Sequence, residues 1–293
     1  MANSISIALH SNENENTIPL MKQWPLIFRN SLAIALMLIL ASGVAVAGPQ
    51  PAANSGFDSY AGRIELRLAR QHQSQSNFLD GPGASESGRK RLRGGEVIVE
   101  KLSPANNPVL PGAMLHHWRG TAFVNGALAA DFERMMKDFN SYPQYFASQV
   151  MQAHLLSERD DGRIDHLSAS MRVRQKHVIT IVMDTAYDVA FAHLDPKHGY
   201  STSRSTRIAE VDSPGTSKEH TLSSSDEHGF LWRLNTYWSW EEREGGLYMQ
   251  IETVSLTRSI PAGLGWAVGP FVESVPRDSL EFTLRSASKN LRR

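Results

Sequence analysis

The stretch Thr236-Tyr-Trp-Ser-Trp-Glu-Glu-Arg-Glu-Gly-Gly-Leu-Tyr-Met-Gln-Ile-Glu-Thr253 predicts a β-hairpin, because a Glu-Gly-Gly turn signal separates two strand-length runs. Closing Glu242 against Leu247 fixes which side chains lie opposite one another. The bulky residues of both strands then share one face, with the pairs Trp240 and Met249, Trp238 and Ile251, and Thr236 and Thr253. The other face collects polar residues and is expected to meet solvent or an interface: Tyr237, Ser239, Gln250 and Glu252.

Strand-length segments precede this hairpin and indicate an antiparallel meander. Turn signals at 160–162, 195–199, 212–215 and 244–246 separate segments 150–158, 163–176, 179–194, 200–211, 230–241 and 247–258, and earlier strands are predicted at 96–100 and 114–124. Two segments alternate strictly and so have one apolar face each. Those faces carry Leu167, Ala169, Met171 and Val173 in one segment, and Ile179, Ile181, Met183, Tyr187, Val189 and Phe191 in the other.

Helices are predicted at both ends of the meander. Residues 129–139 place Phe132, Met135, Met136 and Phe139 at helical spacing, and a short second turn is expected to end near 147. After Pro261 the chain becomes helical again, with an apolar stripe of Leu280, Leu284, Ala287 and Leu291. We expect Pro276 to divide this C-terminal region into two helices, because proline is poorly tolerated inside a helix.

The first part of the chain has the pattern of an exported protein. Lys22 and Arg29 precede the apolar run 32–41, and Ala45-Val-Ala47 offers a small-x-small cleavage site, so residues 21–47 are expected to be a signal peptide. Residues 1–20 are expected to be an untranslated or non-native extension. The destination is periplasmic or extracellular, with cleavage near Ala47.

Residues 48–110 are rich in Ser, Gln, Gly and Pro and predict a flexible arm with a short strand at 96–100, ahead of a folded domain at 111–293. The basic cluster Arg89, Lys90, Arg91 and Arg93 in this arm has two interpretations: a solvated linker, or transient contact with an anionic membrane surface.

Composition argues against several classes of protein. The 30 basic residues balance the 30 acidic ones, so the overall charge does not favour a nucleic-acid partner. The chain has no cysteine, which excludes disulfides, thiol nucleophiles and cysteine-based metal sites.

The order strand, two helices, six antiparallel strands and a long C-terminal helix resembles the START / Bet v 1-like (SRPBCC) superfamily. The segment Asp131-Phe-Glu-Arg-Met-Met-Lys-Asp-Phe-Asn-Ser-Tyr-Pro-Gln-Tyr-Phe146 is similar to its polyketide cyclase/dehydrase or coenzyme-Q-binding branch, although the arm before residue 110 departs from the pattern. The resemblance implies an α+β helix-grip fold, in which a curved antiparallel sheet of about seven strands wraps around a long C-terminal helix.

The resemblance also implies a cavity for a lipid, quinone or polycyclic molecule, whereas inward aromatic and Met side chains can equally fill a core. Candidate polar anchors are Arg204 and Arg207, if either points inward. We expect a binding or transfer protein without metal or cofactor. The candidate lining residues are Met171, Met183, Tyr187, Phe191, Trp238, Trp240, Met249, Ile251, Trp266 and Phe271.

Two alternative functions remain open. A cyclase/aromatase-type enzyme would need an ionisable pair facing the cavity, and the candidates are His166, Asp184, Asp188 and His193. An envelope adaptor would use the outer sheet face and the basic arm. The run from His193 to His198 is interpreted as a turn rather than a metal site, and His116 and His117 must point to opposite faces of a strand.

Overall fold

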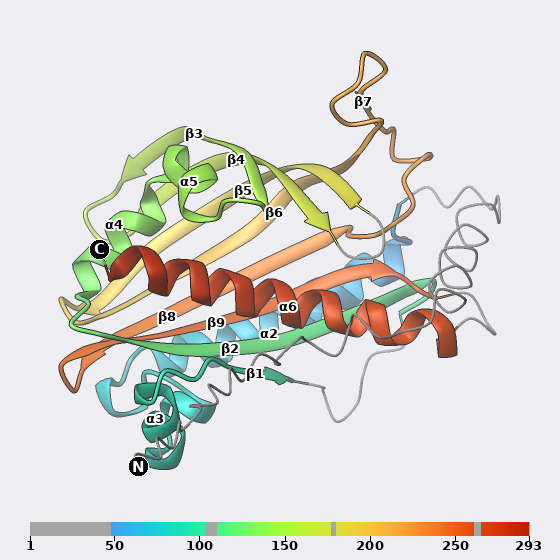
Figure 1. Ribbon diagram of the computed structural model, residues 1–293. Helices are drawn as coiled ribbons and strands as arrows, with labels where there is room; N and C mark the ends of the chain where they lie inside the picture. The colour runs from blue at the N-terminus through green and yellow to red at the C-terminus, as the bar shows by residue number, and fades with distance from the viewer. Residues whose placement is uncertain (1–47, 103–109, 177–179, 261–264, 293) are drawn as a thin grey trace, which may run out of the picture.

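A nine-stranded antiparallel sheet organises the molecule (Figure 1). The computed structural model describes residues 48–102, 110–176, 180–260 and 265–292, and the side chains of the C-terminal helix from residue 274 onward. The strand order is β1-β2-β9-β8-β6-β5-β4-β3, and the short β7 pairs only with β6. The strands are β1 (Ile98–Lys101), β2 (Ala113–Asn125), β3 (Val150–Asp160), β4 (Asp165–Lys176), β5 (Thr180–Asp195), β6 (His198–Asp212), β7 (His220–Thr221), β8 (Arg233–Arg243) and β9 (Gly246–Arg258).

The hairpin of β8 and β9 has the predicted register. Trp240 lies opposite Met249, Trp238 opposite Ile251, and Thr236 opposite Thr253. The β2 strand then pairs with β9 along its whole length, so the end of the sheet is built from segments more than a hundred residues apart. The α+β class and the predicted meander are thereby confirmed, with two short strands bringing the sheet to nine.

The helices on the concave side are α4 (Ala129–Lys137), the short α5 (Tyr142–Tyr145) and α6 (Gly265–Leu291). Figure 1 shows α6 lying across the sheet beneath the curved strands β3 to β6, which is the helix-grip arrangement. The predicted break at Pro276 is wrong, because α6 continues through this residue. Proline removes one backbone hydrogen bond, but burial of Leu280, Leu284 and Ala287 in the main core supports the helix beyond it.

The opposite face of the sheet is covered over β2, β8 and β9 by the N-terminal segment. The helix α2 (Pro51–Gln71), two 3-10 turns and α3 (Glu86–Arg93) occupy the region expected to be a flexible arm. The α2 helix buries Phe57, Tyr60 and Leu68, and Phe57 and Tyr60 share a cluster with Tyr237 of β8 and Val254 of β9. The flexible-arm prediction is therefore wrong for the described residues 48–102, and its few apolar residues suffice because they repeat on one side of α2.

The polar face of the hairpin is consequently buried rather than exposed. Tyr237, Ser239, Gln250 and Glu252 each keep at most 2% of their surface accessible. Polar residues can be buried here because the N-terminal segment supplies partners: the amide of Gln250, for example, donates to the carbonyl of Asp80 at 2.6 Å.

Glu252 is the centre of an ionic network beneath α2. Its carboxylate accepts hydrogen bonds from the Nε atom of Arg119 and the Nε2 atom of His117, both at 3.1 Å, and pairs with Arg67 of α2. Burial raises the pKa of this carboxyl group, whereas the hydrogen bond from His117 and the charges of Arg119 and Arg67 lower it. The lowering effects are larger and bring the pKa to about 2. The network thus ties α2 to the sheet through charge as well as apolar contact.

The predicted extension at 1–20 and signal peptide at 21–47 lie outside the described residues. Within the described part of the chain, no helix is both long and apolar enough to cross a membrane.

Candidate ligand-binding cavity

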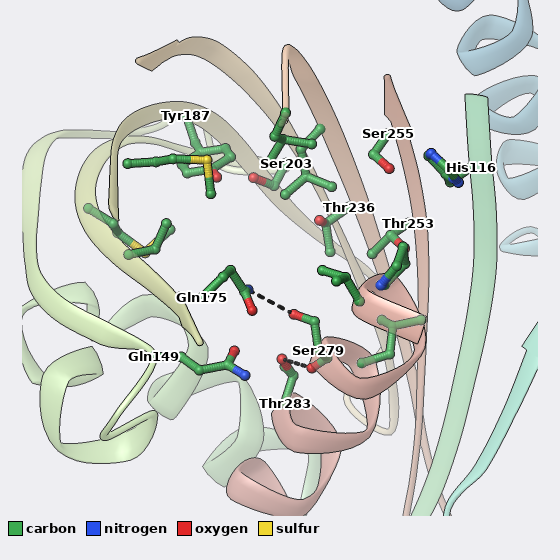
Figure 2. Close-up of a pocket in the computed structure, with 18 of the residues that line it drawn as sticks. His116, Gln149, Gln175, Tyr187, Ser203, Thr236, Thr253, Ser255, Ser279 and Thr283 are labelled. Carbon is green, nitrogen blue, oxygen red and sulfur yellow. Dashed lines mark hydrogen bonds between the residues drawn. The ribbon is translucent and has the colours of Figure 1, made fainter. Parts of the chain in front are cut away.

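A cavity of about 450 Å³ lies between the concave face of the sheet and α6 (Figure 2). This volume is within the roughly 300–1,000 Å³ typical of small-molecule sites. Residues from β2, β4, β5, β6, β8 and β9 form its floor and sides, while α6 and the segment around α5 close it from the other side. The sheet curvature and the position of α6 therefore leave a space between them that side chains do not fill.

Most of the wall is apolar. Six of the predicted lining residues do line the cavity: Met171, Met183, Tyr187, Phe191, Trp238 and Ile251. The α5 region adds an aromatic cluster in which the rings of Phe139 and Tyr142 lie 4.7 Å apart and those of Tyr142 and Phe146 lie 5.0 Å apart. Burial raises the pKa values of both Tyr142 and Tyr187, so these phenols remain neutral.

Trp240 and Met249 do not line the cavity, although they share the face of Trp238. Both are fully buried, and Phe132 of α4 packs edge-on against Trp238 and Trp240, with ring centroids 5.3 Å apart in each case. The α4 helix thus fills this end of the concave face, so that the predicted Trp240 and Met249 are core residues. Trp266 and Phe271 have side chains outside the described residues.

A row of small hydroxyl side chains crosses the cavity floor. Ser203 of β6 pairs with Thr236 of β8, which pairs with Thr253 of β9, and the next rung brings Ser255 of β9 opposite His116 of β2. Figure 2 shows these side chains along one wall of the space. Hydroxyls both donate and accept, so the row offers hydrogen bonds to a guest without introducing charge.

Polar side chains face this row from the helical side. Gln149, Gln175, Ser279 and Thr283 line the cavity near α6 (Figure 2). The Nε2 atom of Gln175 lies 3.4 Å from the Oγ atom of Ser279, which joins the end of β4 to α6. The part of this polar set on β9 has a sequence signal, because the alternation continues past Ile251 to Thr253, Ser255 and Thr257 on one face of the strand.

The predicted polar anchors point away from the cavity. Arg204 is exposed and forms a bidentate ion pair with Glu65 of α2, with both distances 2.8 Å, and Arg207 is exposed on the convex side. Strict alternation would turn residues three apart to opposite faces. A β-bulge between the pairs Ala186–Arg207 and Tyr187–Ser205 places both arginines outside, so neither can be an anchor.

One wall of the cavity is the loop 228–231, which is held by the buried carboxylate of Glu210 near the C-terminal end of β6. Residues 228–231 line the cavity, and Glu210 accepts hydrogen bonds from the backbone N–H groups of His228, Gly229 and Phe230 at 2.9–3.1 Å. The Nδ1 atom of His228 lies 2.7 Å from the same carboxylate. Neither residue can be identified from the sequence, because nothing in the local pattern shows that residue 228 folds back onto residue 210.

The four ionisable candidates for catalysis do not meet in the cavity. Asp184 pairs with Arg172 on the convex side, His193 contacts Glu133 of α4, and His166 lies near Asp161. Asp188 is exposed, and none of the four lines the cavity. The proposed ionisable pair of a cyclase is therefore not formed by these residues.

Part of the surface that the adaptor hypothesis requires is covered. The α2 helix covers the outer face of the hairpin, and the basic cluster lies on or beside α3. Arg91 pairs with Glu96 and both Arg89 and Arg93 pair with Glu244, leaving Lys90 exposed. Three of the four basic side chains of the cluster are therefore engaged in intramolecular ion pairs.

The 193–198 run forms a turn as predicted: Asp195 accepts from the backbone N–H groups of Lys197 and His198 and from the His198 ring at 2.8 Å. In the described part of the chain, no group of three or more histidine or acidic side chains is arranged to hold a metal ion.

Solved structures with a similar arrangement belong to START-type proteins and aromatase/cyclases. A START superfamily protein from Mycobacterium smegmatis has 13% identity, covers 60% of this chain and 97% of its own, and gives a TM-score of 0.39. A STAR-related lipid transfer protein from Xanthomonas axonopodis is 16% identical, covers 67% of this chain and 99% of its own, and gives a TM-score of 0.38. The Zhui aromatase/cyclase from Streptomyces sp. R1128 is 13% identical, covers 61% of this chain and 94% of its own, and gives a TM-score of 0.40.

No protein-family model matches the chain, and no curated protein matches it in sequence. The helix-grip arrangement of this chain rests on its own sheet order and on α6 lying across the sheet (Figure 1).

Proposed function

We propose that this protein binds or transfers a hydrophobic small molecule, of lipid, quinone or polycyclic type, in the cavity between the sheet and α6. The observation that carries the proposal is the cavity itself, about 450 Å³ with a mostly apolar wall and a row of hydroxyls. Each 100 Å² of apolar ligand surface removed from water there contributes about 2.5 kcal/mol before the entropic cost of binding is subtracted.

The charge of the lining supports an uncharged guest. Among the described residues that line the cavity there is no Asp, Glu or Lys, and the only Arg is Arg258. Arg258 belongs to the alternation of Val254 and Leu256, which are buried on the α2 side, so the concave face of β9 is neutral. Hydroxyl and amide groups remain to orient the guest, as in other apolar pockets with a few polar contacts.

A titration with three unrelated apolar compounds tests this function. Pyrene, decylubiquinone and oleyl alcohol are added to the protein, and quenching of tryptophan fluorescence reports binding because Trp238 lines the cavity. Native mass spectrometry of protein purified from its own host then shows whether a compound of one of these types is already bound. Absence of binding by all three, with no copurified molecule, would refute the proposal.

A pair of variants on β6 assigns binding to the cavity. Ser203→Phe places an aromatic ring among the lining residues, whereas Thr206→Phe places the same ring on an exposed position of the same strand. We expect Ser203→Phe to weaken binding at least about tenfold and Thr206→Phe to leave it unchanged, with both variants retaining the circular dichroism of the parent. Equal loss in both variants would place the binding elsewhere.

The proposed function includes export, with cleavage of residues 21–47 and action in the periplasm or outside the cell. Support comes from the sequence alone: a basic start, the apolar run 32–41 and the Ala45-Val-Ala47 cleavage pattern. Fractionation of host cells and N-terminal sequencing of the extracted protein test this part. A cytoplasmic protein that keeps residues 21–47 would contradict it.

A further inference from the structure

The carboxylate of Glu210 and the ring of His228 form a pair at the cavity wall. Glu210 is 4% exposed, and both of its oxygens accept backbone N–H groups: Oε1 from Gly229 and Phe230, and Oε2 from His228. Three backbone N–H donors are therefore aimed at one buried side chain, and both of its oxygens act as acceptors. The Nδ1 atom of His228 also lies 2.7 Å from Oε2.

This geometry fixes which ring nitrogen carries the proton. Because both Glu210 oxygens accept backbone N–H groups, the Nδ1 atom of His228 is the donor in its contact with Oε2. In the neutral imidazole the Nε2 atom then has a lone pair and is an acceptor. No described residue forms a hydrogen bond to this nitrogen, and His228 lines the cavity with 39% of its side chain accessible.

The rest of the lining makes this acceptor distinctive. The hydroxyls of Ser203, Thr236 and Thr253 can each either donate or accept, so they do not select between ligand donors and acceptors. In a neutral histidine whose Nδ1–H donates to a buried carboxylate, the Nε2 atom can only accept. It therefore favours a guest that brings an O–H group to this part of the wall.

We propose that the Glu210–His228 pair is the polar anchor of the cavity and that it selects hydrophobic molecules bearing a hydroxyl group, phenolic or alcoholic, which donates to the Nε2 atom of His228. The proposal rests on the proposed binding function and specifies its ligand class. It assigns to Glu210 a positioning role, since that side chain contacts the loop and the ring rather than the guest.

Two matched probes test the selection. 2-Naphthol donates a hydrogen bond, whereas 2-methoxynaphthalene has the same ring system and an oxygen that only accepts. Both are titrated at pH 8, where an ordinary imidazole is neutral, and dissociation constants are taken from tryptophan quenching. We expect the unmodified protein to bind the naphthol about fivefold more tightly, a modest ratio because water can reach a partly exposed histidine when the hydroxyl is absent.

A conservative variant removes only the acceptor. In His228→Asn the side-chain amide can still donate to Glu210 from the place of Nδ1, but nothing replaces Nε2. We expect the preference for naphthol to fall to within about twofold while the affinity for 2-methoxynaphthalene stays the same. The matched control is His198→Asn, which alters a similar histidine–carboxylate pair with Asp195 outside the cavity and should keep the full preference.

Nitrogen NMR of ¹⁵N-histidine-labelled protein gives a readout that does not depend on a variant being folded. We expect the His228 ring to show the Nδ1–H tautomer and its Nε2 resonance to move on addition of naphthol. The opposite tautomer, equal binding of both probes by the unmodified protein, or an undiminished preference in His228→Asn each overturns the proposed anchor while leaving cavity binding in place. Failure of both probes to bind would instead overturn the binding function and the anchor with it.

Discussion

Acidification should weaken the attachment of α2 to the sheet through His72. This residue caps the C-terminal end of α2, its Nε2 atom lies 2.7 Å from the Oγ atom of Ser239, and its ring stacks on Tyr200 with centroids 4.2 Å apart. Burial and, to a smaller extent, the nearby Arg67 cation together lower its pKa from the ordinary 6.5 to about 4, against a smaller opposing effect of Glu252. The folded protein therefore holds this histidine neutral.

The sign and size of the effect follow from linkage. Above pH 6.5 the ring is neutral in both folded and unfolded chains, so the lowered pKa has no effect on stability there. Below pH 6.5 this histidine becomes protonated in the unfolded chain but stays neutral in the folded one. The free energy of unfolding therefore decreases as the pH falls to about 4. At about 1.4 kcal/mol for each pH unit, the loss over this window is about 3 kcal/mol.

Urea denaturation at several values between pH 7.5 and pH 4 measures this loss in the parent and in His72→Gln, whose amide can still contact Ser239 but does not titrate. We expect the variant to be weaker at pH 7.5 yet to lose about 3 kcal/mol less than the parent across the window. His154→Gln, at an exposed position on β3, is the control and should follow the parent. A His72→Gln protein with the same dependence on pH as the parent would refute the reasoning.

Three further substitutions probe packing through urea denaturation at neutral pH. Gly199→Ala should destabilise by about 1–3 kcal/mol, because the added methyl would lie 2.3–2.7 Å from the Trp240 ring; a neutral result would show that the ring can move aside. Gly62→Ala, inside α2 with nothing within 4 Å, should stabilise by about 0.5–1 kcal/mol if α2 is helical as described. Leu284→Ala, at a fully buried position of α6, should lower the free energy of unfolding by about 2–5 kcal/mol. Its control is Leu66→Ala, at a position that is 65% exposed, which should lower it by under about 0.5 kcal/mol; equal losses would contradict the difference in burial.

The sheet could be predicted from the sequence because its information is local. Alternation fixed the faces of the predicted strands, and one turn at 244–246 fixed the register of β8 and β9. The helix at 129–137 was equally visible from its spacing of Phe132, Met135 and Met136. Each of these signals involves residues within one element or one hairpin, so no knowledge of the rest of the chain was needed.

The packing of residues 48–102 against the sheet could not be predicted, because the sequence pattern that specifies it is divided between distant segments. Seen alone, residues 51–71 have few apolar side chains, and seen alone the hairpin face with Glu252 and Gln250 looks solvent-exposed. Only together do they form a buried interface, in which Arg67 of α2 meets Glu252 of β9 and His72 meets Ser239 of β8. A polar strand face is therefore no evidence of solvent when another segment carries matching donors and acceptors.

The same limit applies to the cavity, and the aromatic residues of β8 show why. Trp238 and Trp240 lie two positions apart on one face of one strand, and no local pattern distinguishes them. Phe132 of α4 contacts both rings, yet Trp238 still borders the cavity and Trp240 does not. Whether an inward aromatic residue lines a space or fills a core is decided by where the covering helix ends. In this fold α4 ends at Lys137, and the concave face beyond it is spanned by α6 at a distance that leaves room for a guest.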